Sequence, residues 1–147
     1  ATEERIKLFP QYENLIRIYY GRWKEMLGGP INLSVDVLKR IKKENKLNVF
    51  ALTNWSAETF PTALKKFDFL NLFDGIIVSG EEKTRKPFEK IYQIALDRFK
   101  IEATKTIFID DNLRNIGAAE KLNIKGIHFK DPNKLVIELK KLKIIYQ

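Results

Sequence analysis

The chain has 147 residues, a formal net charge of +8 and 44% hydrophobic residues, so it has the size of one domain and can bury a core. It has no cysteine, which excludes disulfides and thiolate metal sites. Its sequence contains no apolar run long enough to span a membrane, and its first residues do not resemble a signal peptide. We therefore expect a cytoplasmic protein without a membrane partner.

The excess of positive charge raises the question of nucleic-acid binding. The lysines, however, are spread along predicted helix faces, mixed with glutamates and without interleaved aromatic residues: Lys39, Lys42, Lys43, Lys140, Lys141 and Lys143. This pattern is typical of a solvated surface, so nucleic acid is not the expected partner. The alternative is a non-catalytic basic binding domain, which would be retained on heparin in a strongly salt-dependent way.

The first predicted element is an amphipathic, aromatic-rich helix over residues 11–27, because apolar residues recur there at helical spacing. Gly28-Gly29-Pro30 ends this helix and is the best candidate for a domain boundary. We therefore divide the chain into residues 1–29 and residues 30–147.

Strands and helices alternate after this boundary. Strands are predicted over residues 47–53, 75–79, 106–109 and 126–129. A helix with Val35, Leu38 and Ile41 inward comes first and ends at a turn over residues 45–46, which lies outside the residues that the structure describes. Further helices are predicted over residues 57–67, 88–99, 113–122 and 132–142, with a polar loop over residues 80–85. Ser56 and Asp131 are the predicted caps of the second and the last of these helices. This alternation predicts an α/β fold with a parallel sheet and right-handed crossovers.

The strongest chemical signal lies in residues 107–112, where an apolar strand runs directly into Asp110 and Asp111. Open α/β sheets bind their ligands at this end of the strands. Adjacent carboxylates repel each other, so folding gives no reason for the pair, whereas Mg²⁺ binds such groups readily. The alternative is that Asp110 or Asp111 only caps the following helix.

Two other polar features follow predicted strand ends. Thr53 and Asn54 follow one strand, and Lys86 lies in the loop after the next. Because parallel strands end at a shared edge, a hydroxyl, an ammonium and two carboxylates can converge there. The hydroxyl and the ammonium suit an anion, and the carboxylates suit a metal ion that bridges to it. The alternatives are that the Thr53 hydroxyl bonds backbone and that Lys86 is an ordinary loop lysine.

In this order the motifs resemble those of the haloacid dehalogenase-like hydrolase superfamily, in the branch with a helical cap. The second, third and fourth motifs of that family are matched by Leu52-Thr53-Asn54, by Lys86-Pro87 before Ile91-Tyr92, and by residues 108–112, with Asn115, Ala118 and Ala119 following. The resemblance covers residues 30–147 and implies a Rossmann-like, three-layer core with helices on both faces of a parallel sheet. Residues 1–29 resemble the C-terminal part of the cap.

The family's first motif is an apolar strand that ends in Asp-x-Asp, and this sequence contains no Asp-x-Asp. We therefore expect a fragment that begins inside the cap and is inactive alone. In the resembling fold the first-motif strand lies between the strand ending at Thr53 and the strand ending at Ile109. We expect that slot to be filled in any folded form, by a preceding segment, a bound cleaved piece or a swapped strand.

The resemblance implies a Mg²⁺-dependent phosphatase that acts on a small phosphorylated metabolite through an aspartyl-phosphate, with the nucleophile outside this chain. Asp111 and Asp110 would hold the metal, and Thr53, Asn54 and Lys86 would bind the substrate. Haloacid dehalogenases do not use Mg²⁺, so the acidic pair favours the phosphatase. Asn54 keeps the dehalogenase open as the alternative, because Asn also occurs there in those enzymes, and a phosphomutase uses the same core.

Overall fold

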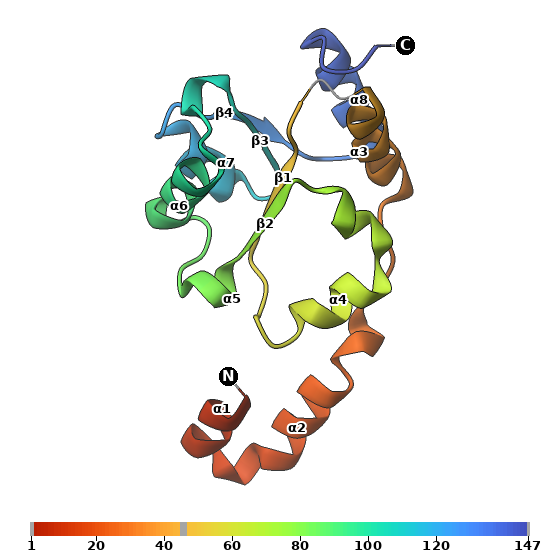
Figure 1. Cartoon of the computed structure of the whole chain (residues 1–147). Coiled ribbons are helices and arrows are strands. Elements are labelled where there is room, and N and C mark those ends of the chain that lie inside the picture. Colours follow the sequence, from red (N-terminus) through yellow and green to blue (C-terminus); the bar gives the residue numbers. More distant parts are fainter. Residues whose placement is uncertain (1, 45–46, 147) are drawn as a thin grey trace.

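The structure is a computed structural model that describes residues 2–44 and 47–146 (Figure 1). Its helices and strands follow in the order α1 (Thr2–Leu8), α2 (Glu13–Gly21), α3 (Asn32–Glu44), β1 (Phe50–Thr53), α4 (Phe60–Lys66), β2 (Gly75–Val78), α5 (Ser79–Glu82), α6 (Glu89–Phe99), β3 (Ile107–Asp110), α7 (Leu113–Glu120), β4 (Lys125–His128) and α8 (Pro132–Lys141). Short 3₁₀ helices lie at η1 (Pro10–Tyr12), η2 (Trp23–Met26), η3 (Asp68–Leu72) and η4 (Ala103–Lys105). The predicted alternation of strands and helices is confirmed.

The four strands form two parallel ladders. β1 pairs with β2 from Phe50 opposite Gly75 to Thr53 opposite Val78. β3 pairs with β4 over residues 107–110 and 125–128. Within the described ranges β1 and β3 are not paired with each other. The predicted α/β fold with parallel strands is thus confirmed, and β1 and β3 each have one edge that faces away from their partner strand.

Helices cover the strands on two faces. On one face, α6 and α7 pack against Leu52 of β1, Ile77 of β2 and Phe108 of β3, so that one helical layer serves both ladders. On the other face, α3 and α8 pack against Ile107 of β3 and Ile127 of β4. Phe108 and Ile107 are neighbours in one strand and point to opposite faces, which gives the three layers of the fold.

The helices α1 and α2 lie below these layers, at the bottom of Figure 1. The predicted helix over residues 11–27 is interrupted: it consists of η1, α2 and η2, none of which contains a buried residue. The interruption after Gly21 lets Trp23 pack edge-on against Trp55 of the core, with ring centroids 5.3 Å apart. Tertiary packing has overridden a regular helical pattern here.

Two predicted boundaries near β1 are wrong. The strand begins at Phe50 rather than at residue 47, because the Asp74 carboxylate accepts the Val49 N–H at 2.7 Å just before the ladder starts. Ser56 does not cap a helix that begins at residue 57. Its hydroxyl accepts the Glu58 N–H at 3.2 Å and closes a turn, and α4 begins only at Phe60.

The polar stretch predicted as a loop over residues 80–85 contains most of the single-turn helix α5. Arg98 of α6 donates to both carboxylate oxygens of Glu82, at 2.6 and 2.8 Å, and this contact holds the turn against α6. The predicted cap of the last helix is confirmed, because the Asp131 carboxylate accepts the Lys134 N–H at 2.9 Å. A contact across 16 residues therefore supports α5, whereas a hydrogen bond across three residues starts α8.

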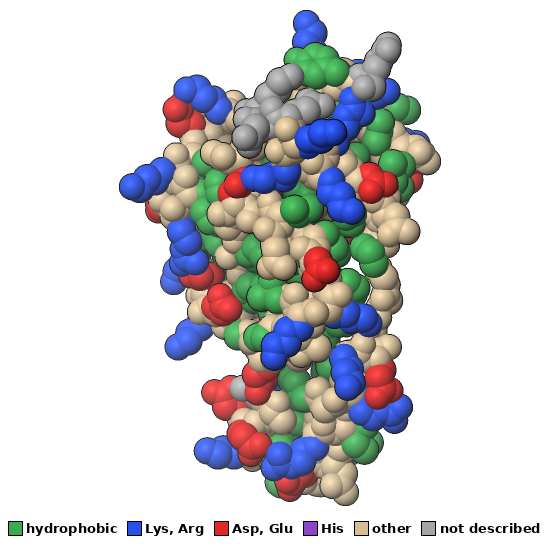
Figure 2. All heavy atoms as spheres, turned by 45° about the vertical axis from the view of Figure 1, so that its right-hand side comes forward, with side chains coloured by type: hydrophobic (Ala, Val, Ile, Leu, Met, Phe, Trp, Pro, Cys, Tyr) green, Lys and Arg blue, Asp and Glu red, His purple; other side chains and the backbone are tan. Residues whose placement is uncertain are grey.

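Figure 2 shows Lys and Arg side chains scattered over the visible face with acidic side chains between them, as predicted for a solvated surface. No helix within residues 2–44 and 47–146 is long and apolar enough to cross a lipid bilayer.

Candidate active site

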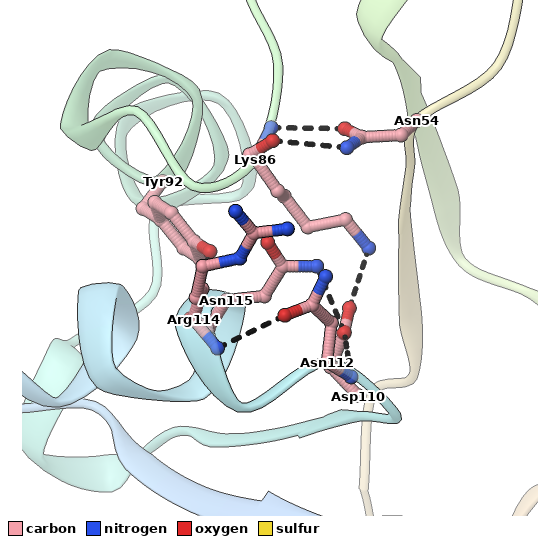
Figure 3. Close-up of polar contacts among 7 residues, drawn as sticks. All are labelled: Asn54, Lys86, Tyr92, Asp110, Asn112, Arg114 and Asn115. Atoms are coloured by element: carbon pink, nitrogen blue, oxygen red, sulfur yellow. Dashed lines mark hydrogen bonds and ion pairs between the residues drawn. The ribbon is translucent and has the colours of Figure 1, made fainter.

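Asp110 is the last residue of β3, and its side chain is only 7% exposed. One carboxylate oxygen accepts a hydrogen bond from Lys86 Nζ at 2.7 Å. The other accepts the Asn112 N–H at 2.9 Å and Asn115 Nδ2 at 2.8 Å (Figure 3). Asp110 is therefore held by three donors from two different parts of the chain.

The hydrogen bonds also fix the ionisation of Asp110. Burial pulls the pKa of this carboxyl upward, but the hydrogen bonds from Lys86, Asn112 and Asn115 outweigh burial, so its pKa is lowered from 3.8. A carboxylate that accepts several hydrogen bonds is stabilised in its charged form. Asp110 is an anion at neutral pH and pairs with the Lys86 cation.

The alternative in which Asp110 or Asp111 caps the following helix is wrong. The N-cap of α7 is Asn112, whose side-chain oxygen accepts the Arg114 N–H at 3.0 Å. The oxygens of Asp110 are turned instead toward Lys86 and Asn115. Neither carboxylate is therefore the N-cap of α7, although Asp110 does accept the Asn112 N–H just before that helix.

Asp111 differs from its neighbour in every contact. The residue is exposed, and its backbone oxygen lies 3.0 Å from His128 Nε2. Among the described residues its carboxylate forms no hydrogen bond or ion pair. Asp111 is therefore the carboxylate of the pair that can accept a ligand without giving up a contact.

Lys86 lies in the loop between α5 and α6, and its side chain is 11% exposed. Its ammonium pairs with Asp110 and lies 5.5 Å from the centroid of the Phe108 ring. Its backbone is held as well: the Asn54 carboxamide accepts the Lys86 N–H at 2.9 Å and donates to the Lys86 carbonyl at 3.0 Å. The alternative of an ordinary, solvated loop lysine is wrong.

Thr53 ends β1 opposite Val78 and is half-buried. In the part of the chain that the structure describes, its hydroxyl forms no hydrogen bond, so the alternative of a backbone-bonded hydroxyl is not observed. Asn54, Lys86 and Asp110 are joined by direct contacts. No such contact joins the side chains of Thr53 and Asp111 to them in the described structure.

Two supporting residues were not among the predicted site residues. Asn115 is 6% exposed and donates to Asp110, and Tyr92 is 1% exposed and donates its hydroxyl to the Asn115 carbonyl at 2.8 Å. Burial, and secondarily the charge of Asp110, raises the pKa of Tyr92 to about 12. The signal in the sequence was Asn115 itself, a polar residue at an inward position of α7, where a buried amide needs a partner.

The donor set fits Mg²⁺ through one of its two carboxylates. This ion needs only one or two carboxylates and keeps several waters, and Asp111 offers an exposed carboxylate with no other partner in the described structure. Asp110 fits less well, because both of its oxygens already accept hydrogen bonds. Within residues 2–44 and 47–146 no three His, Cys, Asp or Glu side chains gather into a metal site. The chain's own contribution would therefore be Asp111, with further ligands from outside the described residues.

The relatives found by comparison with known proteins include a phosphatase and a haloacid dehalogenase. The chain is 34% identical over 105 residues to the sesquiterpene phosphatase astK of Aspergillus oryzae. The aligned region covers 71% of this chain and 54% of that protein. The chain is also 26% identical over 94 residues to (S)-2-haloacid dehalogenase 4A of Burkholderia cepacia. Here the aligned region covers 64% of this chain and 40% of that protein. The chain thus spans about half, or less than half, of the length of these two relatives.

A similar solved structure is that of a haloacid dehalogenase family enzyme of Bacteroides thetaiotaomicron in complex with magnesium and inorganic phosphate. It is 25% identical, has a TM-score of 0.66 and covers 76% of this chain and 58% of that one. The model of the family described as haloacid dehalogenase-like hydrolase matches residues 2–129, which is most of the chain. The chain therefore belongs to the haloacid dehalogenase-like hydrolase family.

Proposed function

We propose that the protein of which this chain is part is a Mg²⁺-dependent phosphatase that acts on a small phosphorylated substrate. The observation that carries the proposal is the buried Lys86–Asp110 pair, with an exposed carboxylate, Asp111, directly after it at the carboxyl end of β3. Two relatives support it by their names: one is a phosphatase, and the other was solved with magnesium and inorganic phosphate.

Each side chain has a role that its contacts allow. Mg²⁺, when bound, would neutralise negative charge on the phosphoryl oxygens. Asp111 would be its ligand from this chain. Lys86 would stabilise charge on the phosphoryl group, held in place by Asp110, and the unbonded hydroxyl of Thr53 would donate to the same group. Positioning and charge stabilisation account for most of the catalysis of phosphoryl transfer.

The nucleophile of this reaction is not among the 147 residues, because the sequence contains no Asp-x-Asp. In the proposed reaction an aspartate from outside these residues attacks phosphorus and forms an aspartyl-phosphate, which water then hydrolyses. The chain alone would therefore show no turnover.

A 2-haloacid dehalogenase is the second candidate, supported by the dehalogenase of Burkholderia cepacia among the relatives. The adjacent carboxylates weigh against the dehalogenase, because a metal-free reaction at carbon would not need the exposed carboxylate of Asp111. An exposed acidic side chain next to a buried ion pair is suited to a cation.

The test is Asp111→Ala in the full-length protein. We expect it to abolish Mg²⁺-dependent turnover of an aryl phosphate with no change in melting temperature, because Asp111 has no internal contact to lose. Asp36→Ala is the matched control, since Asp36 is an exposed carboxylate on α3. Undiminished activity of Asp111→Ala would remove the metal assignment, and turnover of a 2-haloacid without Mg²⁺ would favour the second candidate.

A further inference from the structure

The Asn54 side chain binds the backbone of one loop residue, Lys86, through both of its polar ends. Its oxygen accepts the N–H of Lys86 and its nitrogen donates to the C=O of the same residue, at 2.9 and 3.0 Å. A carboxamide has an acceptor oxygen with two lone pairs and a nitrogen with two N–H donors, so this pairing engages both ends of the group and leaves one N–H over. Figure 3 shows the Asn54 amide opposite the Lys86 backbone, while the Lys86 side chain extends away toward Asp110.

Lys86 consequently crosses between the two ladders. Its backbone is bound to the end of β1 through Asn54, and its ammonium is bound to the end of β3 through Asp110 at 2.7 Å. The loop that carries Lys86 is otherwise exposed at residues 83, 85, 87 and 88, so neighbouring side chains give little burial to hold it. Asn54 supplies the fixed point from which the Lys86 side chain reaches its partner.

We propose that Asn54 is a positioning residue that acts through Lys86, and that it is not a substrate ligand. This pairing uses the oxygen and one N–H of Asn54 to hold the Lys86 backbone, so that only the second N–H stays available to another group. Removing Asn54 would free the loop and let the Lys86 ammonium leave Asp110. The proposal concerns the site of the proposed phosphatase, but its first test does not depend on that activity.

The first test measures the reactivity of individual lysines toward an amine-modifying reagent, followed by peptide mass spectrometry on the full-length protein. In the wild type, Lys86 should react slowly, because its ammonium is buried and paired. Asn54→Ala should raise its labelling rate at least fivefold, while the exposed Lys90 on α6 reacts at an unchanged rate. Asn71→Ala, at an exposed asparagine of η3, is the control substitution. An unchanged Lys86 rate in Asn54→Ala overturns the proposal.

The second test is a double-mutant cycle on turnover. Asn54→Ala should lower kcat about tenfold with little change in KM, and should have no further effect when Lys86 is already alanine, because residues that act as a unit are not additive. Additive losses, or a rise in KM alone, would mean that Asn54 contacts the substrate itself, and would overturn the proposal. Asn54→Asp keeps the acceptor for the Lys86 N–H but loses the donor to the Lys86 carbonyl. If Asn54→Ala does not fold, Asn54→Asp takes its place, and it should raise the labelling rate of Lys86 above that of the wild type.

The two tests separate this inference from the proposed function. Faster labelling of Lys86 in a protein that turns over no phosphate ester would leave the positioning role in place and refute the phosphatase. Unchanged labelling in an active phosphatase would do the reverse.

Discussion

At the scale of single residues, the site combines a fixed charge pair with a free carboxylate. Lys86 and Asp110 are both largely buried and each has additional partners, which is the condition under which a buried ion pair is tolerated. Asp111, one residue later, is exposed. The two aspartates thus differ in their contacts, because Asp110 points into the junction of β3 and α7 whereas Asp111 is exposed.

Lys86→Ala is expected to cut turnover of the full-length protein by about a hundredfold or more, because an ammonium that faces developing charge in a water-poor site is worth that much. The measurement is kcat/KM with an aryl phosphate at a temperature well below the melting point of the variant. Lys90→Ala serves as the control, since Lys90 is exposed on α6. A loss of only twofold would mean that Lys86 serves stability and not catalysis.

At the scale of elements, the start of β1 depends on a carboxylate from outside the strand. Asp74, just before β2, accepts hydrogen bonds from Lys42 of α3 and from the Val49 N–H. The hydrogen bond from Lys42, followed by that from Val49, lowers the pKa of Asp74 from 3.8. One side chain therefore ties α3, the start of β1 and the start of β2 together.

This contact predicts a pH-dependent stability. A carboxyl whose pKa is lowered on folding stabilises the fold above its unfolded pKa, here 3.8, and loses that contribution as the pH falls through the lower folded value. Asp74→Asn should therefore cost about 1 kcal/mol of unfolding free energy at pH 7. The difference from wild type should shrink toward zero as the pH falls below 3.8.

Chemical denaturation between pH 2 and pH 7 measures this difference in the full-length protein. Asp68→Asn is the control, because Asp68 is exposed on η3 and has no ion pair in the described structure. A penalty for Asp74→Asn that stays constant across this pH range would show that the charge of Asp74 does not matter.

At the scale of the whole molecule, β1 and β3 each have one edge with which no strand of the described residues pairs. The Val49 and Trp55 carbonyls accept N–H groups from the residues that flank β2, so by the two-residue period of a strand Phe50 and Leu52 direct their backbone groups the other way. Likewise the Thr106 and Asp110 carbonyls face β4, which turns the backbone groups of Ile107 and Ile109 away from it.

In the resembling fold a first-motif strand would lie beside these backbone groups. Within residues 2–44 and 47–146, β1 pairs only with β2 and β3 only with β4, which agrees with that strand order. Each buried backbone group without a partner costs about 1–3 kcal/mol. The total stability of a domain is only roughly 5–15 kcal/mol, so several such groups together would unfold it. That the slot is filled in any folded form stays a prediction. Its occupant is expected to be an apolar strand that ends in Asp-x-Asp.

Amide hydrogen exchange of the folded protein tests the slot. If it is filled, the amides of Leu52 and Ile109 should be protected to the same degree as those of Ala51 and Phe108, which face the ladder partners. Intact mass and mapping of the chain ends would identify the occupant. Fast exchange of Leu52 and Ile109 in a cooperatively melting protein would mean that the slot is open, and the strand prediction would then be wrong.

The order of the elements and the identity of the polar residues at the strand ends could be predicted from the sequence. Apolar runs such as residues 107–109 are local signals, and so is the cap at Asp131, whose hydrogen bond spans three residues. Strand ends of a parallel sheet meet at one edge whatever the details of packing, which is why Asn54, Lys86 and Asp110 could be expected together.

The contacts of each of these residues depend on tertiary packing and could not be predicted from the sequence. Asp110 and Asp111 are indistinguishable in sequence, and their difference comes from Lys86 and Asn115, 24 and 5 residues away. The pairing of Asn54 with the Lys86 backbone spans 32 residues and has no periodic signature. The start of β1 depends on Asp74, 25 residues further on. Contacts over such separations depend on how the layers pack, and local sequence patterns carry no information about that geometry.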